Sequence, residues 1–389
     1  MNHIIYMNNA ATGYPKFNKT IRAVTSALEN GELSSNRDAV DVLGLGAKIF
    51  RLRAQISDFI GAVESHNICL TPSDSIALNI IIQGLVPKNN TSPVVVFTTP
   101  YEHNSVSRPL AFLERTVPHV IVEKIPFKDG DIDCSALEAL ILRYKKSKFS
   151  IAGAICSHGS NVTGDVIDIA SLGKLLHNYK IPFIVDAAQT IGIVPIDVEQ
   201  SYVDVLTFAG HKFLNGPQGT GGFYVRDSFQ ISPLFFGGTG NGSGEVNPPI
   251  IRPDSFEVGT PATHDLLGLS ASIDVITDDI GKEIYRETIL SCAQYLRDRL
   301  EEIPNIIIYG GYKKETPVVS FNIKNTSCFD VGQHLSSSGI VCRTGIHCSA
   351  YSMTALGLEE YGGSVRLSLG YYNTKKEIDF VINKLKLMS

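Results

Sequence analysis

Short β-branched runs alternate with helix-spaced apolar residues between about residues 66 and 226, and this alternation is the strongest constraint on the fold. Strand–helix–strand alternation is typical of a mostly parallel sheet covered by helices on both faces. In such sheets ligands bind beyond the carboxyl ends of the strands, so we expect the functional residues there. The runs expected to form the strands are residues 67–71, 93–99, 119–126, 150–157, 182–186, 203–208 and 222–225.

A Gly- and Pro-rich stretch over residues 237–261 separates this region from the rest of the chain. Gly and Pro at this density predict a long loop. A long helical pattern follows over about residues 264–302, and the remaining chain mixes strands with helices. We therefore predict an α/β protein with two units, a large α/β unit over residues 15–258 and a smaller α+β unit formed by residues 1–14 and 259–389.

Composition excludes several classes of protein. Of the 389 residues, 43% are hydrophobic and 19% charged, which supplies a sizeable core and argues against disorder. The net charge is −5 and no Lys/Arg-rich block occurs, so neither nucleic acid nor a membrane is an expected partner. No apolar run approaches the roughly 18 residues of a transmembrane helix, and the N-terminus lacks signal-peptide features. The seven cysteines form no Cys-x-x-Cys pair, so we expect a reducing cytoplasm and no metal site.

Lys212 lies in a glycine-dense segment that follows the strand expected at 203–208. A lysine held at a strand end can form a Schiff base when its amine is desolvated and loses its proton. A surface lysine beside a Gly-rich loop is the plainer alternative, because such loops are common.

Asp186 ends the apolar strand expected at 182–186. A buried carboxylate there needs a cationic partner, and the protonated pyridine nitrogen of pyridoxal phosphate (PLP) is one. A helix N-cap is the commoner fate of an Asp after a strand. Together with Lys212, however, Asp186 is a more specific signal than either residue alone.

Two further segments follow strands. His103 comes after the strand expected at 93–99, where an imidazole can stack on a flat cofactor ring and move protons, or simply cap a helix. Residues 71–75 join a strand to a helix, and their hydroxyls and free amides suit a phosphate. Plain helix capping explains that segment equally well.

The C-terminal region contributes a cysteine and an arginine. Cys348 lies in a Gly-containing loop near Arg343 and His347, neighbours that can favour its thiolate. Most of the other cysteines lie in apolar runs and are expected in the core. Arg366 alternates with apolar residues and could hold a carboxylate bidentately, although an ordinary exposed strand arginine fits the same pattern.

These motifs resemble those of the class V aminotransferase group of PLP enzymes, and most closely the cysteine desulfurases. They occur in the family's order over nearly all the chain, and the short Arg-Thr-Gly loop before the cysteine resembles the second of two desulfurase groups. The matching segments are Asn8-Asn9-Ala10-Ala11-Thr12, Glu102-His103-Asn104-Ser105, Asn161-Val162-Thr163-Gly164, Asp186-Ala187-Ala188-Gln189, Gly210-His211-Lys212, Gly259-Thr260-Pro261, Arg343-Thr344-Gly345 ahead of Cys348, and Arg366 ahead of Tyr372-Asn373-Thr374.

The resemblance implies the PLP-dependent transferase type I fold, with a mostly parallel seven-stranded sheet between helices and a smaller C-terminal domain that carries the cysteine loop. It implies that Lys212 bonds the cofactor and that Asp186 pairs with the pyridine nitrogen. It also implies that His103 stacks on the ring and that Gln189 hydrogen-bonds the ring oxygen.

For the phosphate, the resemblance implies contacts from Ser75, the amide of Asp74 and His211. Thr260 would reach the phosphate of the partner subunit, which makes the expected assembly a homodimer with shared active sites. A protein that accepts the sulfur is a further expected partner.

The implied activity converts L-cysteine to L-alanine and transfers the sulfur to Cys348 as a persulfide. Arg366 and Asn161 would bind the substrate carboxylate, with Ala11 and Arg343 also at the substrate site. Two alternatives stay open. One is another class V activity, namely selenocysteine lyase, β-elimination or transamination, and the other is a degenerate non-catalytic scaffold.

The phosphate-binding segment departs from the family pattern at two positions. Asp74 stands where the family usually has Thr or Ala, and a carboxylate beside a dianionic phosphate is repulsive unless it turns away. Ala209 stands in the place of a Ser or Thr hydroxyl. Each lost hydrogen bond to a charged group costs roughly 1.5–3 kcal/mol, so we expect a weaker phosphate cup.

Overall fold

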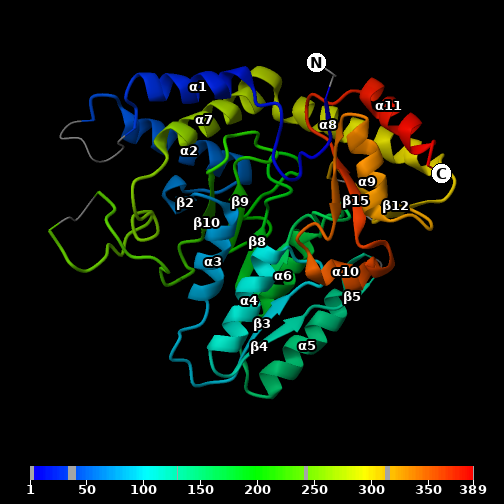
Figure 1. Cartoon of the computed structure of the whole chain (residues 1–389). Helices are drawn as coiled ribbons and strands as arrows, with labels where there is room; N and C mark the ends of the chain where they lie inside the picture. Colours follow the sequence, from blue (N-terminus) through cyan, green and yellow to red (C-terminus); the bar gives the residue numbers. More distant parts are fainter. Residues whose placement is uncertain (1–3, 34–40, 129, 241–243, 312–315, 389) are drawn as a thin grey trace.

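A seven-stranded sheet forms the centre of the larger part of the molecule (Figure 1). The computed structural model of the chain describes residues 4–33, 41–128, 130–240, 244–311 and 316–388. The strands lie in the order β2 (Ile68–Thr71), β10 (Gly221–Val225), β9 (Val205–Ala209), β8 (Phe183–Asp186), β7 (Ser150–Ser157), β3 (Val94–Thr98) and β4 (Val120–Lys124).

Neighbouring strands from β9 to β4 are all parallel, and only β10 runs antiparallel, to both β2 and β9. The predicted mostly parallel seven-stranded sheet is therefore confirmed, and each strand falls on one of the predicted runs. A short antiparallel pair of strands, β5 (Phe127–Lys128) and β6 (Asp131–Ile132), follows β4 in the sequence.

Alternate residues of each strand pack into two different cores, because successive side chains point to opposite faces of a sheet. In β3, Val95 and Phe97 join one core while Val94 and Val96 join the other. The first core includes side chains from α2 (Leu45–Ile60), α5 (Cys134–Lys146), α6 (Ile169–Asn178) and α7 (Thr263–Asp274). The second includes side chains from α3 (Asp74–Gly84) and α4 (Asn104–Thr116).

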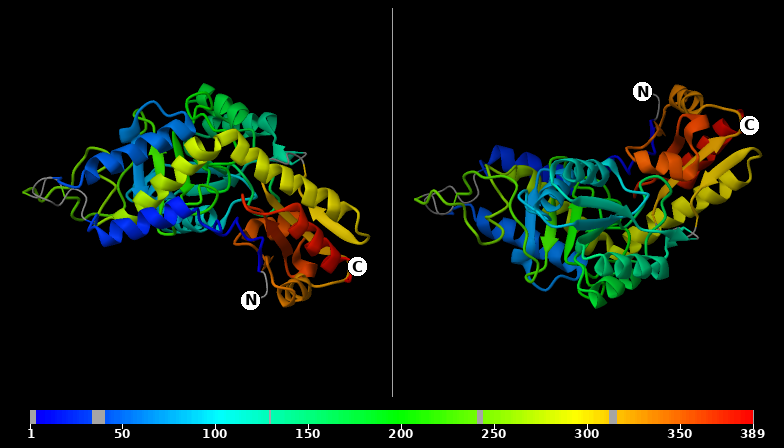
Figure 2. Two further views of the ribbon diagram at one scale, coloured as in Figure 1. Left: turned by 90° about the horizontal axis from the view of Figure 1, so that it is seen from above. Right: turned by 90° about the horizontal axis from the view of Figure 1, so that it is seen from below.

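The C-terminal part has a four-stranded antiparallel sheet in the order β11 (Ile306–Tyr309), β12 (Val318–Ile323), β15 (Ser364–Ser368) and β14 (Arg343–Gly345). Its core includes side chains from α8 (Lys282–Glu301), α9 (Cys328–Ser337) and α11 (Lys375–Leu385). The N-terminal strand β1 (Ile5–Tyr6) pairs with β13 (Ile340–Val341), so the first strand and the last helix of the chain both lie on this part (Figure 2). The helix α10 (Ala350–Leu356) follows the cysteine loop.

The helical pattern over 264–302 does not form one continuous α-helix. The helix α7 runs into a π-helical turn, Val275–Ile280, and α8 begins after Gly281, whose φ is +92°. A positive φ suits glycine because it has no Cβ. The break lies where the chain passes from the core of the large sheet to that of the small sheet (Figure 2). The division into units at residues 258 and 259 stays a prediction.

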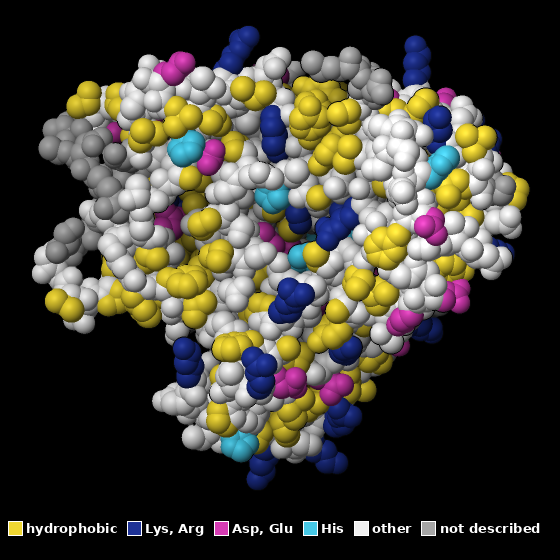
Figure 3. All heavy atoms as spheres, viewed as in Figure 1, with side chains coloured by type: hydrophobic (Ala, Val, Ile, Leu, Met, Phe, Trp, Pro, Cys, Tyr) yellow, Lys and Arg dark blue, Asp and Glu magenta, His cyan; other side chains and the backbone are white. Residues whose placement is uncertain are grey.

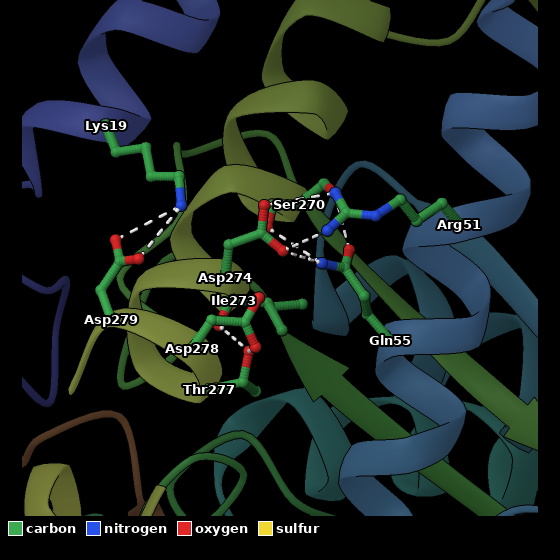
Figure 4. Close-up of polar contacts among 9 residues, drawn as sticks. All are labelled: Lys19, Arg51, Gln55, Ser270, Ile273, Asp274, Thr277, Asp278 and Asp279. Carbon is green, nitrogen blue, oxygen red and sulfur yellow. Dashed lines mark hydrogen bonds and ion pairs between the residues drawn. The ribbon is translucent and has the colours of Figure 1, made fainter. Parts of the chain in front are cut away.

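A group of polar contacts joins α7 to α2, and another joins the π-helical turn to α1 (Asn18–Glu29) (Figure 4). Arg51 donates to both carboxylate oxygens of Asp274, at 2.6 and 3.2 Å, and Gln55 donates to the same carboxylate at 2.6 Å. Lys19 forms an ion pair with Asp279 at 3.3 Å. These contacts connect α2 to α7 and α1 to the π-helical turn.

The Gly- and Pro-rich stretch contains no helix or strand over residues 237–240 and 244–261, in agreement with the predicted loop. Among the described residues, no helix is both long enough and apolar enough to cross a lipid bilayer.

Candidate active site

A cavity of about 210 Å³ opens at the carboxyl ends of the parallel strands. Its wall includes the last residues of three neighbouring strands, Ser157 of β7, Asp186 of β8 and Ala209 of β9. Figure 3 shows basic, acidic and histidine side chains gathered in the depression at the centre of this face. The predicted site residues that line the cavity are Ala11, Asp74, Ser75, His103, Asn161, Asp186, Gln189, His211, Lys212, Arg343 and Arg366.

Lys212 is half-buried in the turn after β9 and lines the cavity. Burial lowers the pKa of Lys212, and the carboxyls of Asp74 and Asp186 partly oppose that shift. No salt bridge to Lys212 is formed within the part of the chain that the structure describes. The surface-lysine alternative is therefore wrong, and the amine is placed in a site where its neutral form is favoured.

Asp186 is 5% exposed and accepts hydrogen bonds from the Ala188 amide at 2.9 Å and the Ser157 hydroxyl at 3.3 Å. Burial raises the pKa of its carboxyl. A buried carboxyl with this desolvation penalty is stabilised by a positive group brought into the cavity. A protonated ring nitrogen is such a group, so the site's acid fits the cofactor that the sequence predicts.

A second buried acid, Glu102, lies behind Asp186, and the sequence analysis gave it no role. It is fully buried and accepts hydrogen bonds from the Thr99 hydroxyl at 2.5 Å and the Ser157 hydroxyl at 2.7 Å. Burial raises the pKa of Glu102 to about 7. Ser157 thus connects two carboxyls, but its single hydroxyl proton can serve only one of them fully.

His103 is the N-cap of α4 and also lines the cavity, so the two roles considered for it coexist. Its Nδ1 accepts the Ser105 amide at 3.1 Å, which assigns the ring proton of the neutral form to Nε2. Burial, with a smaller contribution from nearby Lys212, lowers the pKa of His103 to about 3. The ring in the cavity is therefore neutral at physiological pH.

Gln189 donates to the Ala10 carbonyl at 3.1 Å, and its buried Oε1 has no hydrogen-bond partner. An unpartnered polar atom beside a cavity indicates room for a polar ligand.

The start of α3 forms one end of the cavity. Ser73 caps the helix by accepting the Ile76 amide at 3.3 Å, and the Ser75 hydroxyl lies 2.6 Å from the Ser105 hydroxyl. Gly221 of β10 permits this approach, since a Cβ there would lie 2.8 Å from the Asp74 amide nitrogen. The Asp74 side chain also lines the cavity, and its Oδ1 has no hydrogen-bond partner.

Across the cavity, His211 places Nδ1 3.1 Å from the Thr12 hydroxyl. Burial lowers the pKa of His211 to about 4, with a smaller contribution from Lys212, so the ring is neutral at pH 7.

Arg366 is 1% exposed, so the reading of this residue as an exposed strand arginine is wrong. Its guanidinium donates to the Asn161 carbonyl at 2.9 Å and to the Asn8 side chain at 3.3 Å, and its Nε has no partner. Burial and the charge of Arg343 lower the pKa of Arg366 to about 9. A buried cation with a free donor suits a carboxylate ligand.

The cysteine loop connects β14 to α10. The Arg343 guanidinium donates to the Cys348 sulfur at 2.8 Å, and both His347 and Cys348 have positive φ, at 55° and 58°. The Cys348 carbonyl accepts the Asn104 amide at 2.7 Å, which fastens the loop beside His103. Cys348 does not line the cavity itself but touches Arg343, which does.

Thr260 is not brought together with the other predicted site residues. It lies exposed in the loop before α7, on a second cavity of about 640 Å³ lined by Arg53, Phe256 and Glu257 among others. No group of three or more potential metal ligands was found among the described residues.

Comparisons with known proteins agree with this architecture. The family described as aminotransferase class-V matches residues 5–381. A probable cysteine desulfurase of Methanothermobacter thermautotrophicus is 31% identical, over 97% of this chain and 92% of that protein. The apo structure of a cysteine desulfurase from Thermococcus onnurineus has a TM-score of 0.88 at 28% identity, covering 99% of this chain and 94% of that one. A cysteine desulfurase from Escherichia coli agrees in fold, with a TM-score of 0.84 at 24% identity over 99% of this chain and 94% of that one.

Proposed function

The chain belongs to the aminotransferase class V family, and from that premise we propose that it is a PLP-dependent cysteine desulfurase. The observation that carries the proposal is the meeting of Lys212, Asp186 and Arg366 around one cavity, with the Cys348 sulfur held by Arg343 at its edge. Lysine and aspartate suit the cofactor, arginine suits an amino-acid carboxylate, and a thiol is the group that a transfer of sulfur requires.

The residues present fit PLP. Lys212 would bond the cofactor, Asp186 would face its pyridine nitrogen, and His103 would lie against its ring. Gln189 would hydrogen-bond the ring oxygen, while Ser75, the Asp74 amide and His211 would hold the phosphate. When bound, PLP supplies an electron sink for the negative charge left at the substrate's α-carbon.

L-cysteine would bind at the end of the cavity where Arg366 lies. Arg366 receives the α-carboxylate, and its free Nε offers a donor that the protein does not use. Asn161 positions Arg366 through its carbonyl and the cysteine loop through its side chain, which donates to the His347 carbonyl at 2.6 Å. Ala11 lines the same cavity beside them.

Lys212 moves the α-proton. Its Nζ, whose pKa is lowered by burial, would accept the proton from the α-carbon of the bound substrate. Cys348 Sγ then attacks the substrate sulfur. An S–S bond forms as the substrate C–S bond breaks, and L-alanine results when the β-carbon gains a proton and Lys212 returns a proton to the α-carbon. The sulfur stays on Cys348 as a persulfide until a thiol accepts it.

We further propose a homodimer in which Thr260 reaches the partner's cofactor phosphate. Its support is the exposure of Thr260 together with three large apolar side chains exposed in the same long loop, which are Val246, Ile250 and Ile251. Large apolar side chains left exposed favour a protein interface when they form a contiguous patch. The free state of all seven cysteines supports a reducing cytoplasmic location.

The test is to mix purified protein with L-cysteine and a thiol reductant and to quantify alanine and sulfide together. We expect equal amounts of both from the wild type and neither from Cys348→Ser. Cys342→Ser is the matched control, since Cys342 is a half-buried cysteine of the same region that packs against the small-sheet core, and it should keep the activity.

Sulfide release that persists in Cys348→Ser would remove the assigned role of this thiol. A yellow, PLP-loaded protein that makes neither product would instead keep the fold and the cofactor. In that case selenocysteine, β-elimination substrates and amino-group acceptors become the next substrates to assay.

A further inference from the structure

Asp74 is a buried acid at the end of the cavity proposed to hold the cofactor's phosphate. It is the first residue of α3, is 8% exposed and lines the cavity beside Ser73 and Ser75. Its Oδ1 is buried and has no hydrogen-bond partner. A buried carboxyl oxygen without a donor is costly in the ionised form, because nothing replaces the water that it has lost.

The charges around Asp74 do not favour its ionised form. Asp186 at the end of β8 repels a second negative charge, whereas Lys212 and, more weakly, the Thr207 hydroxyl of β9 favour the ionised carboxyl without cancelling the effect of burial. His103 at the start of α4 and His211 after β9 are neutral at pH 7 because burial lowers their pKa values. The remaining charged groups of the cavity are Arg343 and Arg366, which are proposed to serve the sulfur and the substrate carboxylate.

A bound phosphate increases the negative charge at this end. A phosphate monoester carries about −1.5 to −2 at pH 7, and the free amides at the start of α3 attract that charge. Lys212, the cation that opposes the repulsion, is the residue that would bond the cofactor. An ionised Asp74 would then face the phosphate with no cation of its own.

We propose that Asp74 binds the cofactor's phosphate as a carboxylic acid, with its O–H donating to a phosphate oxygen, so that the site takes phosphate and proton together. The inference rests on the proposed cofactor site but not on desulfuration. It also accounts for how the site accommodates an acid where hydroxyl or small residues are usual in the family.

The proposal predicts a direction for pH dependence. Burial, with repulsion from Asp186, raises the pKa of Asp74 to about 8 in the free protein. Because binding requires the protonated carboxyl, the affinity for a phosphate-bearing ligand is highest at pH values below the Asp74 pKa. The affinity falls as the pH rises above that pKa, by up to about tenfold per pH unit for one proton.

The probe is pyridoxine 5′-phosphate, which lacks the aldehyde and cannot bond Lys212. Its dissociation constant is measured between pH 6.5 and 9.5 for cofactor-free wild type and Asp74→Asn, whose amide keeps a donor at every pH. We expect the ratio of wild-type to Asn dissociation constants to be flat at low pH. Above about pH 8 it should rise toward tenfold per pH unit. Pyridoxine, which has no phosphate, is the control ligand and should give a flat ratio throughout.

Asp74→Ala keeps the test decisive if the Asn variant does not fold, because it removes the donor without adding one. It should bind pyridoxine 5′-phosphate roughly tenfold to a hundredfold more weakly than the wild type at pH 7, with a smaller pH dependence.

Two results would overturn the proposal. A flat wild-type to Asn ratio for pyridoxine 5′-phosphate would mean that the Asp74 proton takes no part in binding. Tighter binding by both variants at every pH would mean that Asp74 is ionised and repulsive. Failure of the wild type to prefer pyridoxine 5′-phosphate over pyridoxine would overturn the cofactor site itself. Loss of desulfuration alone would leave these binding results standing.

Discussion

The two ends of the active-site cavity are built differently. At the end proposed to hold the cofactor ring (the ring end), Asp186 receives two hydrogen bonds and is connected through Ser157 to the fully buried Glu102. At the end proposed to hold its phosphate (the phosphate end), Asp74 has an unpartnered oxygen and Ala209 offers no hydroxyl. The ring end keeps every residue type of the family motif, whereas the phosphate end does not.

The difference follows from what each end must bind. A ring nitrogen needs one anion at one position, and only a carboxylate supplies it at neutral pH. A phosphate has several oxygens that backbone amides and hydroxyls can share, so a side chain there can change if its charge is compatible. Substitutions at the two ends should therefore differ in size, and the following predictions test that ordering.

The largest effect is expected at the ring end, from Asp186→Asn. Loss of the buried anion removes the partner of the positive ring nitrogen, and alanine formation should fall by about 10²–10³-fold at saturating L-cysteine. The measurement is alanine production per bound cofactor, with cofactor content read from its absorbance. An equal loss for Asp74→Asn, assayed in parallel with saturating PLP, would erase the proposed difference between the ends.

Arg343→Ala should have the next largest effect. Its guanidinium donates to the Cys348 sulfur, so its removal should slow alanine and sulfide formation by about tenfold to a hundredfold, as expected for one charged hydrogen bond. The cofactor absorbance should stay unchanged, and Arg343→Lys should restore part of the rate. Reduced PLP affinity in Arg343→Ala would instead place this residue among those that hold the cofactor.

A smaller effect is expected at the phosphate end from Ser75→Ala. One neutral hydroxyl contributes about 0.5–1.5 kcal/mol, so PLP affinity should fall by roughly twofold to tenfold while the rate at saturating PLP holds. Equilibrium titration with PLP measures the affinity. Asn79→Ala is the matched control, because Asn79 lies one turn further along α3, does not line the cavity, and donates from its side chain to the Ser75 carbonyl at 2.8 Å.

The strands of the central sheet were predicted more accurately from the sequence than the helices that follow it. The seven strands are apolar runs that are read directly from the sequence, whereas their order in the sheet is known only from the structure. The break at Gly281 was missed because the helical spacing of apolar residues continues across it. That spacing cannot reveal that α7 packs on the large sheet and α8 on the small one.

Which polar side chains are buried could not be predicted from the sequence. Arg366 is buried because Asn8 and Asn161, both more than 200 positions away, accept its hydrogen bonds. Glu102 accepts hydrogen bonds from Thr99, three residues before it, and from Ser157, whose sequence separation of 55 hides the contact from the sequence. In both cases the signal lies in tertiary packing, so only the motif order marked these segments as important.

Asp274→Ala provides the smallest expected effect on activity and so the baseline for both ends. Asp274 lines no part of the cavity, and its carboxylate accepts hydrogen bonds from Arg51 and Gln55 of α2 (Figure 4). Arg51 is 56% exposed and regains water when its partner is removed, so the loss should be about 1–2 kcal/mol of stability. The melting temperature should drop by a few degrees, while PLP affinity and alanine formation per bound cofactor stay at wild-type values. A change in either of those two quantities would show that the covering helices α2 and α7 help to shape the cavity. The difference in sensitivity between the two ends of the cavity would then depend on the helices α2 and α7 as well as on the residues that line the cavity.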